Sequence, residues 1–548
     1  MGSGVRAVDA APVVLRRAFI VAAAVFVSGA VVLGMEIAAS RVVAPFFGNS
    51  LFVWGSLIGV VLAGLSIGYW AGGWLADRWP TPSLLAAVMG LGALLVLAIP
   101  VFDEPVLEAI VNWDPGPRLN PLFASIALFG PASVVLAGVA PIAVRLWARS
   151  LETLGQTAGR LFAISTAGSI AGTFATAFWL IPEFGTDQLL GIAAATLFAA
   201  ATIVALSERL ILITALTAAG VALAGYAAVE LAPETGGTLS RVQARNWSPL
   251  YRTSGYVKGQ EPADTTGLRL RYSKDTRYHR LSVADDETTR YLRFDNSYQS
   301  GMIINRPFAT AFEYADFFHL LRAYNPNARR VLFIGLGGGS SPKRLWRDFP
   351  DLQLQAVELD PVVVDVAYRF FELPRDDRLQ VAVEDGRRYL DDNGGRYDAV
   401  LIDAFFADAI PFHLFTTEFM ELARSRLNPG GVIMTNAIGS IAGARSRLFR
   451  SVYRTYRAVF PTVLVHPVIL GGDEDDTAVR NLILVATEGA APAKPFLVDR
   501  WNEIRSRYPL APDLTQQIRD RHDRPIPIDG VPTLTDQYAP TDALLLIE

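Results

Sequence analysis

Seven long runs of apolar residues occupy the first 230 positions of the chain. They cover residues 18–42, 51–75, 82–102, 120–144, 160–182, 187–206 and 210–230. A helix needs about 20 mostly apolar residues to cross the hydrocarbon core of a bilayer, so the pattern predicts a transmembrane helical bundle over residues 1–230. Glycines at short spacing, such as Gly168 and Gly172, would let neighbouring helix backbones approach closely in lipid.

The pattern of apolar and polar positions changes after residue 230. Residues 231–265 contain no long apolar run and are interpreted as a linker. Short segments with alternating apolar and polar residues follow, which are typical of strands, and a helical pattern comes after them. The strands are expected at 268–272, 280–284 and 290–294, and the helix at 309–323. We therefore expect a small β-rich lobe over residues 266–325.

In the last part of the chain, apolar strands alternate with helices. Strands are expected at 330–334, 354–359, 379–383, 399–402 and 432–435, with helical patterns between most of them. Strand–helix repetition of this length predicts a doubly wound parallel sheet, and hence a Rossmann-like α/β domain over residues 326–548. In such sheets, ligands bind at the carboxyl ends of the strands.

Composition supports the division into an apolar part and a water-soluble part. Hydrophobic residues make up 51% of the chain and charged residues only 19%, which is too apolar for an ordinary soluble enzyme. The formal net charge is −4, so nothing indicates a nucleic-acid-binding surface. The chain has no cysteine, which excludes thiolate catalysis and cysteine-bound metals, and its five histidines show no metal-ligand spacing. No metal site is expected.

Glycines and carboxylates directly follow the expected strands. Glycines after the first strand allow a tight turn close to a ligand, and a carboxylate about 20 residues further on can hold two ribose hydroxyls. A second carboxylate, after the third strand, can accept the adenine amino group. Helix capping is the alternative role for both carboxylates, and the glycine loop by itself would also suit NAD. The candidate nucleotide-binding residues are Gly335, Gly337, Gly339, Glu358, Asp360, Asp385 and Gly386.

The motifs of the α/β part resemble those of spermidine synthase, a polyamine aminopropyltransferase. The resemblance runs over about residues 277–436 and includes the segments VLFIGLGGGSSPKRL, AVELDPVVVDVA, VAVEDGRRYL, YDAVLIDAF and LNPGGVIMTN. It implies transfer of an aminopropyl group from decarboxylated S-adenosylmethionine to a diamine, with release of methylthioadenosine. It also implies that Gln299 binds the ligand and that Asp403, after the fourth strand, is the general base.

Three features depart from the family pattern on the side that binds the amines. The aspartate that grips the aminopropyl amine is replaced by Gly338, and the second aspartate of the Asp-Ser-Ser-Asp motif by Phe406. The Tyr-His/Gln-Glu trio is present as Tyr314-Ala315-Asp316. Because of these departures, a methyltransferase that uses intact S-adenosylmethionine on a membrane-associated acceptor stays open. The residues expected to bind the acceptor are Tyr314, Asp316, Asp408 and Asp536.

The apolar part carries resemblances of its own. Residues 72–78 resemble the loop after the second helix of major facilitator transporters, and residues 158–185 and 534–545 resemble the membrane-fused branch of the spermidine synthase family. This implies a multi-pass protein of the bacterial inner membrane. Its partners would be the lipid bilayer and a small amine, with no nucleic acid, and a homodimer is compatible with the resemblance. A transporter with a nucleotide-sensing domain is a third hypothesis.

Basic residues beside the apolar runs indicate how the bundle is oriented. Arg16, Arg17, Arg78 and a cluster at 145–160 place the start of the chain in the cytoplasm. Seven spans would then put the α/β domain outside. Because S-adenosylmethionine derivatives are made in the cytosol, we expect instead that one run does not span, or that the chain has one further span. The catalytic domain would then be cytoplasmic.

Overall fold

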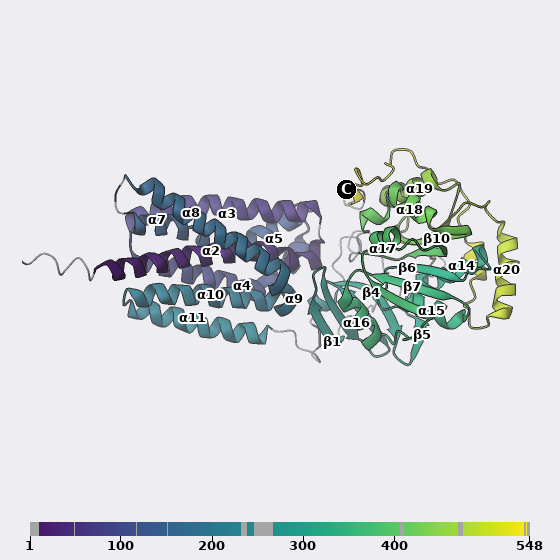
Figure 1. Ribbon diagram of the computed structural model, residues 1–548, viewed down its shortest axis with the longest axis horizontal. Coiled ribbons are helices and arrows are strands. Elements are labelled where there is room, and N and C mark those ends of the chain that lie inside the picture. Colours follow the sequence, from purple (N-terminus) through teal and green to yellow (C-terminus); the bar gives the residue numbers. More distant parts are fainter. Residues whose placement is uncertain are drawn as a thin grey trace, which may run out of the picture. The chain divides into compact units, whose positions relative to one another are not determined.

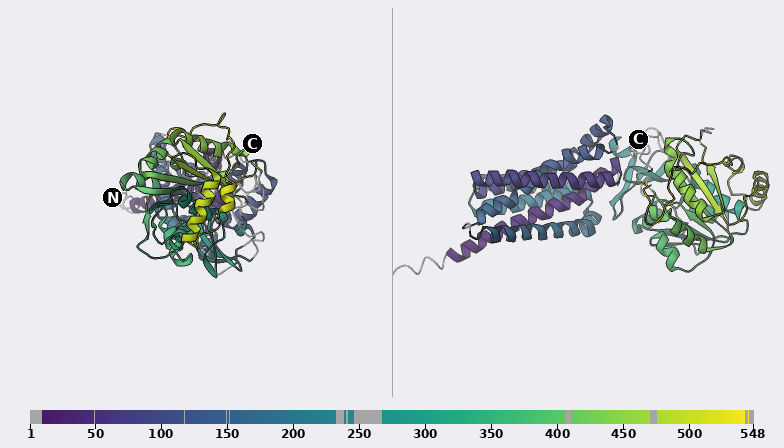
Figure 2. Two further views of the ribbon diagram at one scale, coloured as in Figure 1. Left: turned by 90° about the vertical axis from the view of Figure 1, so that its right-hand side faces the viewer. Right: turned by 90° about the horizontal axis from the view of Figure 1, so that it is seen from above.

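The computed structural model of the chain forms two compact units. The first comprises Met1–Glu234 and Lys274–Arg277, and the second Thr235–Ser273 and Tyr278–Glu548. Figures 1 and 2 show the first unit as a set of long helices and the second as sheets covered by helices. The structure describes residues 10–48, 50–116, 118–148, 150, 152–231, 238–239, 241–245, 267–405, 410–469, 475–541 and 544.

The helices of the first unit lie side by side along a common direction (Figure 1). Seven stretches of the described residues are long and apolar enough to cross a membrane, judged by length and composition. The seven predicted helices are therefore confirmed, including the last two, which only a short turn separates. They are Arg16–Phe47, Leu51–Arg78, Pro82–Trp113, Gly130–Trp147, Leu154–Phe184, Thr186–Ser207 and Ile211–Glu230.

Two of these stretches are divided into shorter helices. The fourth belongs to a broken run of three helices, α5 to α7, and the fifth passes from α8 through a π-helical turn, η1, into α9. The helices of the first unit are α2 (Ala10–Phe47), α3 (Leu51–Arg78), α4 (Pro82–Trp113), α5 (Asn120–Leu128), α6 (Gly130–Ala137), α7 (Val139–Trp147), α8 (Leu154–Ala175), η1 (Thr176–Leu180), α9 (Ile181–Phe184), α10 (Thr186–Ser207) and α11 (Ile211–Glu230).

Glycines allow helix backbones of the first unit to touch. A Cβ atom added at Gly168 or Gly172 of α8 would collide with the backbone of α2, at the carbonyl groups of Phe26 and Ala30 respectively. Small residues provide such contacts where lipid removes the hydrophobic driving force between helices. The predicted close approach of helices at these two glycines is confirmed.

The second unit begins with a sheet of five strands in the order β1-β2-β3-β4-β5. The three predicted strands are confirmed, but β4 and β5 are missing from the prediction. β4 is buried over nearly its whole length, which removes the alternation that identifies a half-exposed strand. The predicted helix at 309–323 begins at Glu313 instead, because residues 309 and 310 belong to β5. The elements are β1 (Arg269–Asp275), β2 (Arg280–Asp285), β3 (Thr289–Phe294), β4 (Ser297–Ile303), β5 (Arg306–Thr310), the 3-10 helix η2 (Glu313–Leu320) and α14 (Leu321–Tyr324).

The second sheet of this unit has seven strands in the order β11-β12-β10-β9-β6-β7-β8. The five predicted strands, β6 to β10, form the expected parallel core. β12 is antiparallel to both β10 and β11, which corrects the expectation of a wholly parallel sheet. The strands are β6 (Arg330–Ile334), β7 (Gln353–Glu358), β8 (Leu379–Val383), β9 (Tyr397–Ile402), β10 (Leu427–Gly439), β11 (Thr462–Pro467) and β12 (Arg480–Thr487).

Helices cover both faces of the seven-stranded sheet (Figure 1). Val331 and Phe333 of β6 pack into a core with α14, α15 and α20, whereas Leu332 and Ile334 pack into a second core with α17, α18 and α19. A strand that is apolar throughout needs cover on both faces, because successive side chains point to opposite sides. The remaining helices are α12 (Arg241–Ala244), α15 (Ser340–Asp348), α16 (Pro361–Phe370), α17 (Gly386–Asp392), η3 (Phe412–Leu414), α18 (Thr417–Ser425), η4 (Ala444–Ser446), α19 (Arg447–Val459), α20 (Lys494–Arg507) and α21 (Thr515–Arg519).

The order of strands reverses at β6. The next strands along the chain, β7 and β8, lie on one side of β6, and β9 and β10 lie on the other. The connections that follow β6 and β9 therefore diverge at the carboxyl ends of these strands. Open α/β sheets bind their ligands in the crevice at such a point.

The contact between α8 and α2 gives a test of the bundle. We expect Gly172→Ala to destabilise the protein by about 1–3 kcal/mol, as overpacking does, because the new methyl group would meet the Ala30 backbone. Gly159→Ala is the matched control on the same helix, since no atom lies within 4 Å of its added Cβ. Thermal unfolding of the two purified variants measures the difference, and equal transition temperatures would contradict the packing.

Candidate functional site

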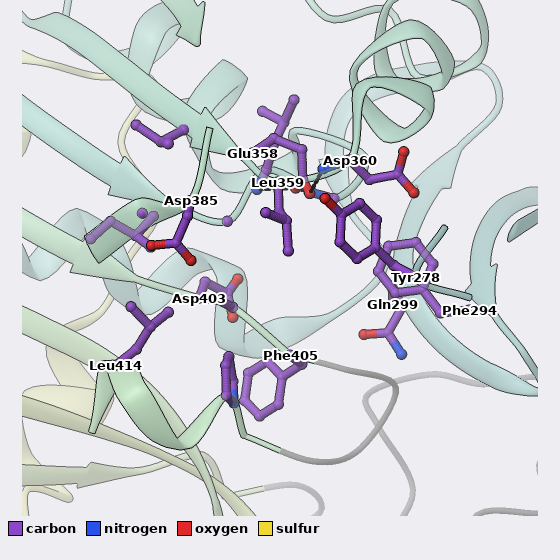
Figure 3. A pocket seen from close by; sticks show the side chains of 18 of the residues that line it. Tyr278, Phe294, Gln299, Glu358, Leu359, Asp360, Asp385, Asp403, Phe405 and Leu414 are labelled. Carbon is purple, nitrogen blue, oxygen red and sulfur yellow. Dashed lines mark hydrogen bonds between the residues drawn. The ribbon is translucent and has the colours of Figure 1, made fainter. Parts of the chain in front are cut away.

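A cavity lies at the crevice beside β6 and β9 (Figure 3). It encloses about 830 Å³ of space between protein atoms, part of which is open to solvent. Its walls come from the ends of four parallel strands and from the five-stranded sheet. The lining residues lie at 278–279, 294, 299–300, 314, 334–337, 357–360, 384–386, 403–405, 411 and 413–414.

The glycine loop after β6 is part of the lining of this cavity. Gly335 has a φ of +92°, and its N–H donates to the carbonyl oxygen of Val357 at 2.9 Å. A Cβ at this position would collide with the carbonyl oxygen of Asp403. Gly337 also has a positive φ, of +54°, and lines the cavity. The missing side chains of this loop therefore let its backbone pass close to Asp403 and Ser300 at the edge of the cavity.

Glu358 ends β7 and holds the glycine loop. Its Oε2 accepts hydrogen bonds from the N–H groups of Leu336 at 3.0 Å and Gly337 at 3.4 Å, and its Oε1 accepts one from Asp360 N–H at 3.1 Å. Burial raises the pKa of the Glu358 carboxyl, although these N–H donors oppose the rise. Glu358 is thus a loop-holding carboxylate on the cavity wall and caps none of the helices of the described chain.

Asp385 follows β8 and has a separate role for each oxygen. Oδ1 caps α17 by accepting hydrogen bonds from the N–H groups of Arg387 and Arg388, both at 3.0 Å. Oδ2 is 3.1 Å from Nε2 of His413. The hydrogen bond from His413 is the main cause that lowers the pKa of Asp385. The capping alternative is realised, and the second oxygen still lies at the cavity beside Gly386.

Asp403 follows β9 and lies between the other groups of the cavity (Figure 3). Its Oδ1 accepts a hydrogen bond from Asn436 Nδ2 at 2.9 Å, and Asn436 in turn accepts one from Asn481 at 2.8 Å. The Tyr314 hydroxyl also hydrogen-bonds to Asp403. Burial raises the pKa of Tyr314 well above its usual value, and the Asp403 carboxylate adds to the rise. The carboxylate is therefore oriented by residues from three other segments.

An aromatic wall faces the carboxylates from the five-stranded sheet (Figure 3). The ring of His279 stacks on Phe294 with a centroid distance of 3.7 Å, and its Nε2 is 3.7 Å from Oδ2 of Asp360. Oδ1 of Asp360 caps α16 through Val362 N–H at 2.9 Å. Gln299, which is buried on β4, donates to Ser297 Oγ at 3.0 Å and lines the same wall.

The remaining predicted residues lie elsewhere. Asp316 lies 2.9 Å from Arg344. Asp536 accepts hydrogen bonds from both terminal nitrogens of Arg387, at 2.7 and 2.6 Å. Neither carboxylate is among the residues that line the cavity. Gly339 starts α15 and also lies outside the lining. Asp408 and Phe406 fall outside the described residues. The roles of Asp316, Asp408 and Asp536 in binding an acceptor stay predictions.

Several lining or supporting residues are absent from the sequence-based set. His413 is a lone histidine with no partner evident in the sequence. Tyr278 and His279 reach the cavity because the residues just before β2 lie beside Asp360. Asn436 carried a usable signal, since together with Thr435 it interrupts the apolar run at the end of β10. A buried amide there indicates a partner, which the structure shows to be Asp403.

Gly338, which the sequence resemblance aligns with an aspartate of the family, has close neighbours in the structure. A Cβ at Gly338 would lie 2.9 Å from Cδ1 of Phe371 and 3.0 Å from Cβ of Ser300. Its N–H donates to Ser300 Oγ at 2.9 Å, which holds the two segments together. An aspartate would have to displace both neighbours.

The chain is similar to several known proteins. Residues 312–470 match the family model of the spermine/spermidine synthase domain. The chain is 37% identical over 232 residues to the polyamine aminopropyltransferase of Vibrio vulnificus, a match covering 40% of this chain and 71% of the relative. It is 31% identical over 212 residues to the eEF1A lysine and N-terminal methyltransferase of Danio rerio, covering 35% of this chain and 29% of that protein. A solved probable spermidine synthase of Corynebacterium glutamicum is 18% identical with a TM-score of 0.39, covering 49% and 97% of the two chains.

The position of Glu358 gives a test of nucleotide binding. We expect Glu358→Ala to weaken binding of methylthioadenosine by about 1.5–3 kcal/mol, as when a hydrogen bond to a charged group is lost. Calorimetry on the purified full-length chain measures this, with Glu503→Ala, an exposed carboxylate on α20, as the control. Tight binding of NAD together with no binding of adenosyl compounds would contradict the assignment.

Proposed function

The chain belongs to the polyamine aminopropyltransferase family, and from this premise we propose that it moves an aminopropyl group from decarboxylated S-adenosylmethionine to a diamine. It is a transferase. The observation that supports the specific reaction is the arrangement of Glu358, Asp385 and Asp403 around one cavity beside the glycine loop (Figure 3). Two of these carboxylates suit the adenosine part of the donor, and the third, Asp403, follows the strand that lies beside β6.

The glycine loop and the two outer carboxylates would bind the adenosine part of the donor. Glu358 would accept hydrogen bonds from the ribose hydroxyls, and Oδ2 of Asp385 would accept one from the adenine amino group. Hydrogen bonds to an ionised carboxylate are about twice as strong as neutral ones. Both side chains are already held by backbone N–H groups, so little rearrangement is needed when the donor binds.

Transfer requires an amine with a free lone pair. A diamine ammonium has a pKa near that of lysine, about 10.4, so it is mostly protonated at neutral pH. In the proposed step Asp403 accepts this proton, and the nitrogen attacks the carbon beside the sulfonium. The carbon–sulfur bond breaks with its electron pair going to sulfur, and methylthioadenosine leaves as a neutral thioether.

We also propose that the first unit is inserted in a bilayer. The support is the set of seven helices of sufficient length and apolar composition. A cytoplasmic catalytic unit requires an even number of spans if the basic flank of α2 is cytoplasmic, and all seven helices have the length to cross. A cytoplasmic start of the chain followed by seven spans would place the catalytic unit outside, whereas the supply of the donor favours a catalytic unit in the cytoplasm.

A second candidate reaction is methyl transfer from intact S-adenosylmethionine. Packing around Gly338 favours it, because a carboxylate at this position, where it would hold the aminopropyl amine, would require Phe371 and Ser300 to shift. A methyl group carries no ammonium, so methyl transfer needs no carboxylate to hold the transferred group, although the amino acid arm of the intact donor keeps its own ammonium and carboxylate. The likeness to a methyltransferase of Danio rerio agrees with this candidate.

The proposed base gives a direct test of aminopropyl transfer. General-base assistance is typically worth about 10²–10⁴-fold. We expect Asp403→Asn to lower turnover by this factor, because the amide keeps the shape but cannot accept the proton. Binding of methylthioadenosine should stay near wild type, since Glu358 and Asp385 are unchanged. Release of methylthioadenosine with putrescine measures turnover, and calorimetry measures binding.

An Asp403→Asn variant that folds normally and turns over at the wild-type rate would remove Asp403 from the mechanism. The control is Asp499→Asn, which alters an exposed carboxylate on α20, outside the cavity. If the wild type transfers methyl but never aminopropyl groups, the second candidate holds and Asp403 is at most a positioning residue.

The glycine at position 338 predicts the relative affinities of the site for decarboxylated S-adenosylmethionine and methylthioadenosine. Without a carboxylate for the aminopropyl ammonium, decarboxylated S-adenosylmethionine should bind within about tenfold of methylthioadenosine, a difference of about 1.4 kcal/mol. Gly338→Asp should bind neither compound better, because its side chain would displace Phe371 and Ser300. Competition calorimetry tests both statements. A preference of several hundredfold for the decarboxylated donor would show that another carboxylate grips the amine.

A further inference from the structure

The helices of the first unit alternate in direction, so their ends gather in two groups. Arg17 at the start of α2 is 3.0 Å from Glu208 after α10, and Arg145 near the end of α7 is 3.6 Å from Asp77 near the end of α3. These ends of the helices define end A of the bundle. End B comprises the connections from α2 to α3, from α4 to α5 and from α9 to α10, together with the end of α11.

Basic residues are concentrated at end A. No lysine precedes Lys258, so arginine alone determines the basic charge of the bundle. Short basic loops stay in the cytoplasm when a membrane protein inserts, whereas acidic residues contribute little to orientation. Among the described residues, end A carries Arg16, Arg17, Arg78, Arg145, Arg160 and Arg209, and end B carries Arg41 and Arg118.

Each stretch has the length to cross the hydrocarbon core. The last two, Thr186–Ser207 and Ile211–Glu230, contain 22 and 20 residues, which at about 1.5 Å per residue gives about 30 Å or more. The hydrocarbon core is about 30 Å thick. The shortest stretch, Gly130–Trp147, follows α5 directly in the broken run of α5 to α7. The lengths of the seven stretches therefore agree with seven crossings of the membrane.

We infer that end A faces the cytoplasm and that the catalytic unit lies on the extracytoplasmic side of the membrane. Seven crossings carry the chain from end A to end B, where α11 ends at Glu230. The inference rests on the proposed insertion of the first unit and replaces the expectation of a cytoplasmic catalytic unit. It does not depend on which group the enzyme transfers.

The orientation determines where the substrates are used. The acceptor would be an amine, or another nucleophile, outside the cytoplasm, and the leaving thioether nucleoside would be released there. An adenosyl sulfonium carries a fixed positive charge and does not cross a bilayer unaided. A separate transport step must therefore deliver the donor to this site.

The cysteine-free sequence allows a sharp test by single-cysteine labelling, because the wild type gives no background. Three exposed positions serve as probes: Glu152→Cys at end A, Asn112→Cys at end B and Glu503→Cys in the catalytic unit. Intact spheroplasts are treated with a membrane-impermeant maleimide, before and after lysis. We expect the Asn112→Cys and Glu503→Cys variants to be labelled in intact spheroplasts and the Glu152→Cys variant only after lysis.

Every other pattern overturns the inference in a recognisable way. Labelling of Glu152→Cys with protection of Glu503→Cys would mean the reverse orientation, and equal behaviour of these two would mean an even number of crossings. Recovery of the wild type in the soluble fraction would instead refute insertion, and with it part of the proposed function. Transferase activity is measured separately on the purified full-length chain, so a failure of the chemistry leaves the labelling result intact.

Discussion

The crevice at the carboxyl ends of the parallel strands depends on one close backbone contact, between Gly335 and Asp403. Asp403 N–H donates to the carbonyl oxygen of Ile334 and Gly335 N–H to that of Val357, both at 2.9 Å. These hydrogen bonds bring the ends of three neighbouring strands together. Only glycine fits at position 335, because a Cβ would strike the Asp403 carbonyl. The glycine loop, the carboxylate of β7 and the proposed base share one cavity because of this contact.

The carboxylates of the cavity are held before any ligand arrives. Glu358 accepts N–H groups of the glycine loop, Asp385 caps α17, and Asp403 is oriented by Asn436. Buried polar groups need such partners, since an unpaired group costs about 1–3 kcal/mol. The same hydrogen bonds that stabilise the fold therefore preorganise the site, which limits the rearrangement needed on binding.

Glycine has different roles in the two units because their surroundings differ. In the bundle, Gly168 and Gly172 let α8 touch the backbone of α2, where lipid offers no hydrophobic driving force. In the second unit, Gly335 lets the loop after β6 pass close to the Asp403 carbonyl at a positive φ that other residues rarely adopt. At Gly338 a Cβ would lie 2.9 Å from Cδ1 of Phe371 and 3.0 Å from Cβ of Ser300, so glycine here permits close packing of side chains.

The sequence alone determined the seven helices, the parallel core of the sheet and the carboxylates at its strand ends, because each leaves a local pattern of apolar runs, glycines and acids. It missed β4, whose burial removes alternation, and the wall formed by Tyr278 and His279. Asp385 shows the limit most clearly, since its pairing with His413 spans 28 positions and has no local signature. Only the tertiary structure decided these contacts, because they depend on which strand ends the sheet order brings together.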